Sequence, residues 1–369
     1  MRLSSIELRR VALPLVRPFR TSFGTETSKE CVLVRVETSD GTVGWGEGVT
    51  GPEPGFSEEW NDGLWLVIRD FLAPAAFGAG DLGAEDLSGV LSGVRGNPMA
   101  KAALINAVLD AQLREAGRSL AAYLGAERDR VECGVSVGIT PTAEELVDQV
   151  AGYLAEGYRR IKLKIEPGTD VERVTAVREA NPDVLLSVDA NAAYTLADAR
   201  IFRALDPLGL LMVEQPLHHD DLVEHARLQA QIATDLCLDE SIRSAADAAA
   251  ALELGACRIV NIKQGRVGGL LEARRVHDVS RAQDAPVWCG GMLETGIGRA
   301  ANLALAALPG FTLPGDTSAS ARYFADDLTV PFEMAPDGTM AVPQRPGIGV
   351  EPRADRLAAC TLQVESLRP

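Results

Sequence analysis

Lysine is scarce in this chain. Only five of the 36 basic side chains are lysine, and the other 31 are arginine. Arginine keeps its proton at any working pH, whereas a lysine in an apolar or cationic site can release one. Three of the five lysines lie in two short apolar stretches, Lys162 and Lys164 in RRIKLKIEPG and Lys263 in RIVNIKQG. We therefore expect these three lysines to take part in proton transfer.

Net positive charge, paired cysteines and long apolar runs are also missing. The net charge of −16 argues against binding to nucleic acid or to an anionic membrane surface. No stretch approaches the roughly 20 apolar residues of a membrane span, and from the charges scattered through the first residues we expect no export signal there. The six cysteines have no CxxC spacing, and four of them fall in or beside expected strands. We expect free thiols and a cytoplasmic location.

Side chains with acid or base chemistry recur about every 25 residues. From Lys164 the chain reaches Asp189, Glu214, Asp239 and Lys263 in steps of 25, 25, 25 and 24 residues. Each of these residues ends an apolar run that is typical of a buried strand, and segments with helical periodicity separate the runs. Strands that alternate with helices indicate right-handed βαβ units and a parallel sheet.

Three further runs extend this series to eight expected strands. They are residues 134–138 before it, and residues 286–291 and 311–316 after it. Eight such units predict an α/β fold, a (β/α)8-type (TIM-like) barrel, whose chemistry gathers at the carboxyl ends of its strands.

The barrel period is absent at both ends of the chain. Residues 1–125 combine strand-like runs, a turn at Asp40-Gly41 and helical stretches, which predicts an α+β capping domain. Residues 126–320 would form the barrel. Residues 321–369 are turn-rich, with Asp337-Gly338 as the tip of a hairpin, and we expect this segment to pack back on the capping domain and complete it.

Three carboxylates at the ends of consecutive strands would converge. Asp189, Glu214 and Asp239 would repel one another strongly unless a cation neutralised them. Oxygen ligands suit Mg²⁺ or Mn²⁺ better than zinc. Each acid taken singly could instead bond to neighbouring backbone. Asn191 has two open interpretations, a hydrogen-bond partner of this group or a helix N-cap.

The lysines would approach this group from two sides. Lys162 and Lys164 are two apart on a strand and so share one face, and their proximity should depress the pKa of at least one of them. Lys263 comes from a strand four positions round the barrel. One lysine could remove a proton from the carbon next to a carboxylate, and the other could return one to the opposite face. A divalent cation would stabilise the enediolate between these steps. The alternative is that the lysines form structural ion pairs with the acids.

These motifs resemble a known family. KxK (162–164), DAN (189–191), EQP (214–216), DES (239–241) and NIK (261–263) are similar to those of the muconate-lactonizing branch of the enolase superfamily. The resemblance implies a lysine or histidine base that acts together with Mg²⁺. The strings PLVRPFRTSFGT, CGVSVGI, NIKQGRVGG, WCGGMLETGIGRA and LPGDTSAS resemble N-acylamino acid racemases and o-succinylbenzoate synthases within that branch.

The resemblance implies roles for individual residues. Lys164 and Lys263 would be the acid/base pair, and Lys162 would assist with charge. Mg²⁺, with Mn²⁺ or Co²⁺ as alternatives, would be bound by Asp189, Glu214 and Asp239. The substrate pocket would be lined by Ser136, Asn191, Phe19, Phe23, Gly291, Met292, Leu293 and Asp316.

Some details depart from the family pattern or have another interpretation. Without the resemblance, Phe19 and Phe23 are more simply core residues. Gln264 stands where relatives often have proline. His218-His219 replaces a stretch that is usually acidic, and we do not favour zinc there, because no other histidine shares an expected strand end.

The favoured function is a racemase of N-acyl (N-succinyl) amino acids that acts on a small carboxylate substrate. The alternative is an o-succinylbenzoate synthase, with both activities in one site as a further option. Dipeptide epimerase and muconate cycloisomerase are weaker alternatives. Other classes are a Schiff-base aldolase, a zinc hydrolase, which four histidines make unattractive, and a non-catalytic binding module. The resemblance also implies a homo-oligomer.

Overall fold

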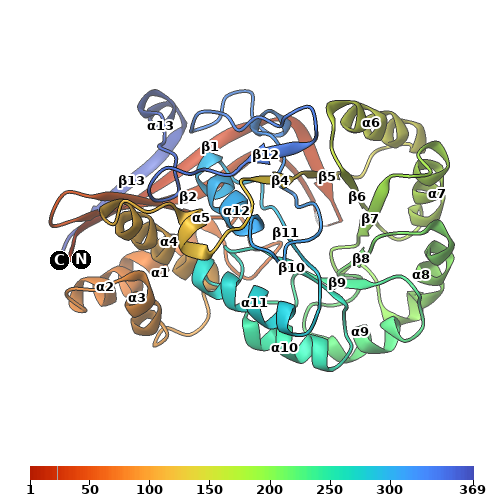
Figure 1. Ribbon diagram of the computed structural model, residues 1–369, viewed down its shortest axis with the longest axis horizontal. Helices are drawn as coiled ribbons and strands as arrows, with labels where there is room; N and C mark the ends of the chain where they lie inside the picture. Colours follow the sequence, from red (N-terminus) through yellow and green to blue (C-terminus); the bar gives the residue numbers. More distant parts are fainter. Residues whose placement is uncertain (23) are drawn as a thin grey trace.

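A capping layer and a barrel make up the protein. The computed structural model describes residues 1–22 and 24–369. Figure 1 shows the barrel strands ringed by helices on one side and an antiparallel sheet with its own helices on the other.

The capping sheet is antiparallel and four-stranded, in the order β13-β1-β2-β3. Its two long strands form a hairpin whose end reaches the barrel, where Ile139 N donates to Arg20 O at 3.0 Å. The turn between β2 and β3 falls at Asp40-Gly41, as the sequence predicts, and Gly41 supplies a φ of +83° there. The strands are β1 (Leu3–Thr21), β2 (Gly24–Thr38), β3 (Val43–Gly48) and β13 (Thr361–Leu367).

One long helix covers this sheet. α4 (Pro98–Glu115) is buried on nearly all sides, and its backbone comes very close to β3. A Cβ on Gly46 would lie 2.0 Å from Ala103 O, and one on Gly44 would lie 2.1 Å from Ala107 O, so only glycine permits this approach. The other helices here are α1 (Asn61–Val67), the π-helix η1 (Ile68–Leu72), α2 (Ala73–Gly78), α3 (Ala84–Leu91) and α5 (Leu120–Leu124).

The barrel sheet is parallel, in the order β11-β10-β9-β8-β7-β6-β5. Its strands are short and almost wholly buried, which explains their continuous apolar runs. They are β5 (Gly134–Val137), β6 (Arg160–Lys164), β7 (Leu185–Asp189), β8 (Val213–Glu214), β9 (Leu236–Leu238), β10 (Ile259–Ile262) and β11 (Val287–Cys289).

Helices follow the barrel strands along the chain. They are α6 (Ala143–Glu156), α7 (Asp170–Ala180), α8 (Ala199–Leu205), α9 (Leu222–Gln229), α10 (Ala245–Glu253), α11 (Leu270–Ala282) and α12 (Gly296–Ala306), with 3-10 turns η2 (Leu196–Asp198), η3 (Asp206–Leu208) and η4 (Ser320–Arg322). The predicted fold class, a TIM-like barrel with an α+β cap, is confirmed.

The eighth strand, expected over 311–316, is not a regular strand. The segment does occupy the eighth position, because Phe311 bridges to Val287 of β11 and Gly315 bridges to Cys133 beside β5. Pro314 lacks an N–H group, so the segment cannot form a continuous ladder with its neighbours. The barrel is closed by single bridges at this point.

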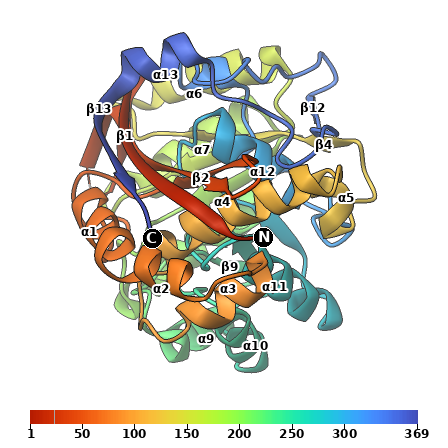
Figure 2. The same ribbon diagram turned by 90° about the vertical axis from the view of Figure 1, so that its left-hand side faces the viewer.

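The C-terminal segment contacts both parts of the molecule. β12 (Thr339–Ala341) pairs with β4 (Arg130–Glu132), which the sequence did not suggest, and α13 (Ala354–Cys360) leads into β13. β13 pairs with β1, with Leu367 opposite Ile6, so the first and last strands of the chain are neighbours in the capping sheet (Figures 1 and 2). The domain boundaries at 125/126 and 320/321 stay predictions.

All six cysteines are buried and free, as expected. None of the helices that the structure describes is long and apolar enough to cross a membrane.

Candidate active site

The periodic residues meet at one end of the barrel. Lys162 and Lys164 lie on β6, Asp189 ends β7 and Glu214 ends β8. Asp239 and Lys263 directly follow β9 and β10. Asp189 and Glu214 are register partners in neighbouring strands. A cavity of about 280 Å³ opens between this end of the barrel and the capping layer, and all three lysines line it.

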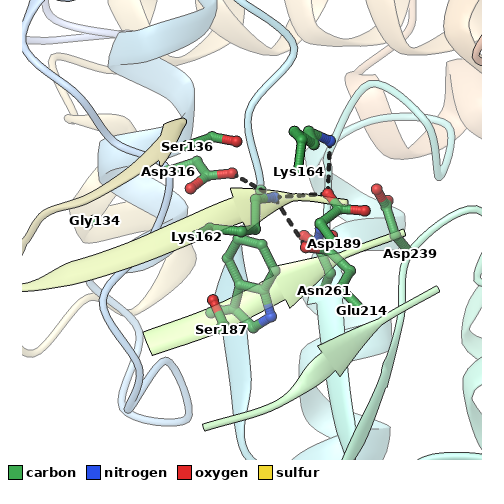
Figure 3. A network of polar contacts seen from close by, with 12 residues as sticks. Gly134, Ser136, Lys162, Lys164, Ser187, Asp189, Glu214, Asp239, Asn261 and Asp316 are labelled. Atoms are coloured by element: carbon green, nitrogen blue, oxygen red, sulfur yellow. Dashed lines mark hydrogen bonds and ion pairs between the residues drawn. The ribbon is translucent and has the colours of Figure 1, made fainter. Parts of the chain in front are cut away.

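Lys162 stands at the centre of the acids (Figure 3). Its ammonium group lies 2.9 Å from Glu214 Oε2, 3.1 Å from Asp189 Oδ2 and 2.8 Å from Asp316 Oδ2. The indole ring of Trp288 lies beneath it, 4.7 Å from Nζ to the ring centroid. An ammonium group held by three carboxylates and an aromatic face is a fixed positive charge.

Lys164 is less enclosed than Lys162. Its Nζ donates to Asp189 Oδ2 and to Asn191 Oδ1, both at 2.6 Å. Asn191 has a φ of +43° and in turn donates to Glu240 Oε1 at 3.0 Å. Asn191 is therefore a hydrogen-bond partner within this group. It is not a helix N-cap, since Thr195 precedes the next helical turn.

Lys263 approaches from the far side. Its Nζ donates to Asp239 Oδ2 at 2.7 Å, and Arg266 pairs with the other oxygen of the same carboxylate. β10 and β6 are four places apart in the strand order. In a barrel of eight positions, this places Lys263 opposite Lys164, with the acids between them. Their different carboxylate partners, Asp239 and Asp189, hold the two amines apart.

The acids change the proton affinity of Lys162 in an unexpected direction. Burial alone would lower the pKa of its ammonium, but Asp316, Glu214 and Asp189 together raise that pKa well above its ordinary value. The expectation of a depressed pKa is thus wrong for Lys162, because the nearby carboxylates outweigh both burial and any neighbouring cation.

The carboxylates respond to the same groups. Burial raises the pKa of Glu214, assisted by Asp189. Burial also raises the pKa of Asp189, but the positive charges of Lys164 and Lys162 lower it by more, so the pKa of Asp189 lies below the ordinary range. The buried carboxyl groups therefore stay ionised in this arrangement only because cations lie beside them.

The chemistry of the donors fits a divalent ion, although their present spacing is set by the lysines. Asp189, Glu214 and Asp239 offer oxygen ligands from three adjacent strands, which suits a hard cation. In the described part of the chain they do not each bring an oxygen within 4.8 Å of the others; the group that meets this distance is His218, His219 and Asp220. Ammonium groups pair with each of the three acids. A metal ion held by the same acids would balance their negative charge in place of these ammonium groups.

The residues expected to line the substrate surround the same cavity. Ser136, Asn191, Gly291, Met292, Leu293, Asp316 and Phe19 all line it. Ser136 Oγ is buried and has no hydrogen-bond partner within residues 1–22 and 24–369. Phe19 lies near the end of β1 and packs edge-on against Tyr323, with ring centroids 6.4 Å apart. Phe23 lies outside the described residues.

Asp316 differs from the other lining residues. It pairs with Lys162 and also accepts from Arg160 Nη2 at 2.6 Å. Burial would raise the pKa of its carboxyl, but these two cations hold that pKa below the ordinary range. Asp316 therefore fixes Lys162 in place as well as facing the cavity.

The two departures from the family pattern have different surroundings. Gln264 is buried, and its Oε1 accepts from Asn106 Nδ2 of α4 at 2.5 Å, so it joins the barrel to the capping helix. His218 and His219 are exposed, with their rings stacked at 4.3 Å between centroids. They lie beyond the end of β8 and do not line the cavity that contains the lysines.

Several residues of the site were not identified from the sequence. Arg266 donates to Asn261 O and Ile242 O, both at 2.7 Å, in addition to its pair with Asp239. Asn261 donates to Glu214 Oε1 at 2.7 Å. Both residues flank Lys263 in NIKQGR, and that proximity was the available signal.

The capping layer supplies two more unforeseen contacts. The ring of Phe56 lies over Lys263, with 4.2 Å from Nζ to the ring centroid, and Lys29 lines the cavity from β2. Nothing in the local sequence around either residue indicates this, because the contacts depend on how the cap folds over the barrel.

Known proteins resemble this chain over its full length. Residues 5–125 match the family described as "Mandelate racemase / muconate lactonizing enzyme, N-terminal domain", and residues 145–356 match "Enolase C-terminal domain-like". A protein of Amycolatopsis named N-succinylamino acid racemase is 58% identical, with 98% of each chain covered. A protein of Geobacillus stearothermophilus named o-succinylbenzoate synthase is 51% identical, with 93% of this chain and 92% of the relative covered.

Solved structures agree with these relatives. The crystal structure of an enolase superfamily member from Listeria innocua superposes with a TM-score of 0.96 at 40% identity, covering 100% of this chain and 99% of the other. Two matching domains, close relatives over the whole chain and a shared fold lead to one conclusion: the chain belongs to the enolase superfamily and is an enzyme of its mandelate racemase and muconate-lactonizing group.

Proposed function

We propose that this enzyme racemises N-acyl amino acids, with N-succinyl amino acids as the preferred class, by moving a proton on and off the α-carbon. One observation carries the proposal. Lys164 and Lys263 come from opposite positions of the barrel, bond to different carboxylates and line one cavity. A 1,1-proton transfer requires two groups that reach opposite faces of the same carbon.

Each lysine has a distinct part. Lys164 would take the α-proton from one enantiomer and Lys263 from the other, and the opposite lysine would return a proton to the enediolate. Lys162, fixed between three carboxylates, would contribute positive charge near the reacting carboxylate. The cavity between barrel and cap would exclude water while the carbon is deprotonated.

Asp189, Glu214 and Asp239 would hold a divalent metal ion, which members of this superfamily bind, typically Mg²⁺. The ion would stabilise the negative charge that builds up on the substrate's carboxylate oxygens as the α-carbon loses its proton. Asn261 and Arg266 would orient Glu214 and Asp239 from behind.

A second function deserves comparison because relatives of both kinds exist. The protein 51% identical to this chain is named o-succinylbenzoate synthase. Dehydration also begins with removal of a proton next to a carboxylate, so the same lysines could serve it. It needs only one base together with an acid for the departing hydroxyl, whereas racemisation needs both lysines to act as bases.

The decisive experiment measures solvent-deuterium exchange at the α-carbon. Each enantiomer of N-succinylphenylalanine is incubated with the enzyme and Mg²⁺ in D₂O, beside the dehydration substrate. The proposal expects exchange into both enantiomers. Dehydration without exchange into either enantiomer would favour the synthase and remove the racemase assignment.

Two broader properties belong to the same proposal. Six buried free thiols support a reducing, cytoplasmic setting. A homo-oligomeric assembly is proposed by analogy with the family, and gel filtration with light scattering would test it.

A further inference from the structure

The distribution of lysine points to one more functional residue. Lys29, Lys162, Lys164 and Lys263 all line the cavity between the barrel and the cap. The fifth lysine, Lys101, donates to Val94 O and does not line the cavity. Four of five lysines thus face one chamber, yet the proton-transfer scheme uses only the three that come from the barrel.

Lys29 is a buried charge with weak partners. It lies on β2 opposite Leu13 of β1, and only 3% of it is exposed. Its Nζ donates to Val49 O at 3.4 Å and Thr50 O at 3.3 Å, both long hydrogen bonds. No ion pair within 4.0 Å involves it in the part of the chain that the structure describes. An ammonium group has three donors, and burying one without a close anion is costly. The third N–H group is available to a ligand.

Its place in the cavity is set by contacts between cap and barrel. Val49, whose carbonyl accepts from Lys29, packs against Gly265, where an added Cβ would lie 2.3 Å from Val49 Cγ2. Gly265 follows Lys263 by two residues. Lys29 is therefore held in the cap side of the chamber (its roof), close to the loop that follows β10, while Lys162, Lys164 and Lys263 line the chamber from the barrel side.

Other charges in the roof are negative. Glu26 and Glu53 line the cavity but are exposed, and Glu59 is buried, where it accepts from Met99 N and Ala100 N at the start of α4. Among the described lining residues, Lys29 is the cation that the cap contributes. An anionic group of a substrate that reaches the roof would be repelled by these acids and attracted by Lys29 alone.

We propose that Lys29 binds the distal carboxylate of an N-succinyl substrate, so that this cavity selects dicarboxylates. The inference rests on the proposed function, in which the α-carboxylate lies at the barrel side of the chamber, near Lys162 and the metal ion that Asp189, Glu214 and Asp239 would hold. The succinyl arm then extends toward the roof of the chamber. Its carboxylate forms an ion pair with Lys29 and accepts a hydrogen bond from the third N–H group of the ammonium.

The first test compares N-succinylphenylalanine with N-butyrylphenylalanine, which carries a methyl group in place of the distal carboxylate. In the wild-type enzyme the ratio of kcat/KM for the two should be about 10- to 100-fold in favour of the succinyl compound, the range for a hydrogen bond between charged groups. Lys29→Met should bring this ratio to within about 3-fold of unity, and Lys29→Arg should keep most of it. Lys101→Met is the matched control and should leave the ratio unchanged.

A structural role for Lys29, for example as a distant counter-charge to Glu47, would lower turnover of both compounds together and leave the ratio intact. That outcome would overturn the proposal. So would a wild-type ratio below about 3-fold, since a bound charge pair of this kind is worth more than that.

Direct binding separates this inference from the racemase assignment. Calorimetric titration of both compounds, with Mg²⁺ present, reports the same discrimination without turnover. If the wild type binds the succinyl compound more tightly and Lys29→Met does not, while no α-exchange occurs, the racemase proposal fails and the role of Lys29 stands. Equal binding of both compounds by the wild type refutes the role of Lys29 whatever the exchange shows.

Discussion

Replacing Glu47 with glutamine should change how the stability of this protein depends on pH. Glu47 lies on β3 and is buried beneath the start of α12. Its carboxylate accepts from Thr295 N at 3.0 Å, Thr295 Oγ1 at 2.6 Å and Gly298 N at 2.9 Å. It joins the capping sheet to the helix that follows the lining segment Gly291–Leu293.

Burial raises the pKa of the Glu47 carboxyl from 4.5 to about 7, against the hydrogen bonds from Thr295. A raised pKa means that the folded protein favours the protonated form. The contribution of Glu47 to the free energy of unfolding is therefore fully present below about pH 4.5 and is lost as the pH rises through about 7. At roughly 1.4 kcal/mol per pH unit, the loss is about 3 kcal/mol.

The assay is denaturant unfolding of wild type and Glu47→Gln at several pH values between 4.5 and 8. Other acids titrate in this range, so the informative quantity is the difference between the two proteins. We expect the free energy of unfolding of wild type to fall by about 3 kcal/mol more than that of the variant. Parallel pH profiles would refute the reasoning, because they would show that Glu47 has the same proton affinity in the folded and unfolded chains.

Four other predictions can be checked with simple variants. Lys164→Ala and Lys263→Ala should each lower racemisation by at least about 1,000-fold, and Lys164→Arg should not restore it, because arginine cannot act as a base; near-normal rates in the alanine variants would exclude the two-lysine scheme. Chelation of divalent ions should abolish α-exchange, and added Mg²⁺ should restore it; full activity after exhaustive chelation would contradict the metal assignment. Gly46→Ala should destabilise by about 1–3 kcal/mol or more, since the new Cβ would lie 2.0 Å from Ala103 O, whereas Gly78→Ala, with nothing within 4 Å, should not; comparable melting temperatures of the two variants would contradict this. Phe56→Leu should weaken the hold on Lys263 and slow α-exchange of one enantiomer about 3- to 30-fold more than the other; equal effects on both would show that the ring acts only as packing.

The location of the site could be predicted because it follows from a local regularity. Lys164, Asp189, Glu214, Asp239 and Lys263 recur with the period of one strand and one helix, and parallel strands bring such positions to one end of a barrel. Local chemistry also predicts the turn at Asp40-Gly41, where a residue with positive φ is required.

The electrostatic balance at that end could not be predicted in the same way. Two neighbouring lysines suggest a depressed pKa, but Asp316, Glu214 and Asp189 together raise the pKa of Lys162, and Asp316, the largest contributor of the three, lies 154 residues further along the chain. The eighth barrel position likewise looked like a strand, since its apolar residues fit, while Pro314 prevents a regular ladder.

Sequence alone thus determined the barrel, the cap and the identities of the acids and amines at the strand ends, because these depend on periodicity and on side-chain type. Only the tertiary structure decided which groups pair with each lysine. It also decided that the ring of Phe56 covers Lys263 and that Lys29 lines the chamber from the capping layer. The pairs Lys162–Asp316 and Phe56–Lys263 join residues more than 100 positions apart. The contacts made by Phe56 and Lys29 in the chamber also depend on how the cap packs on the barrel, which no local pattern encodes.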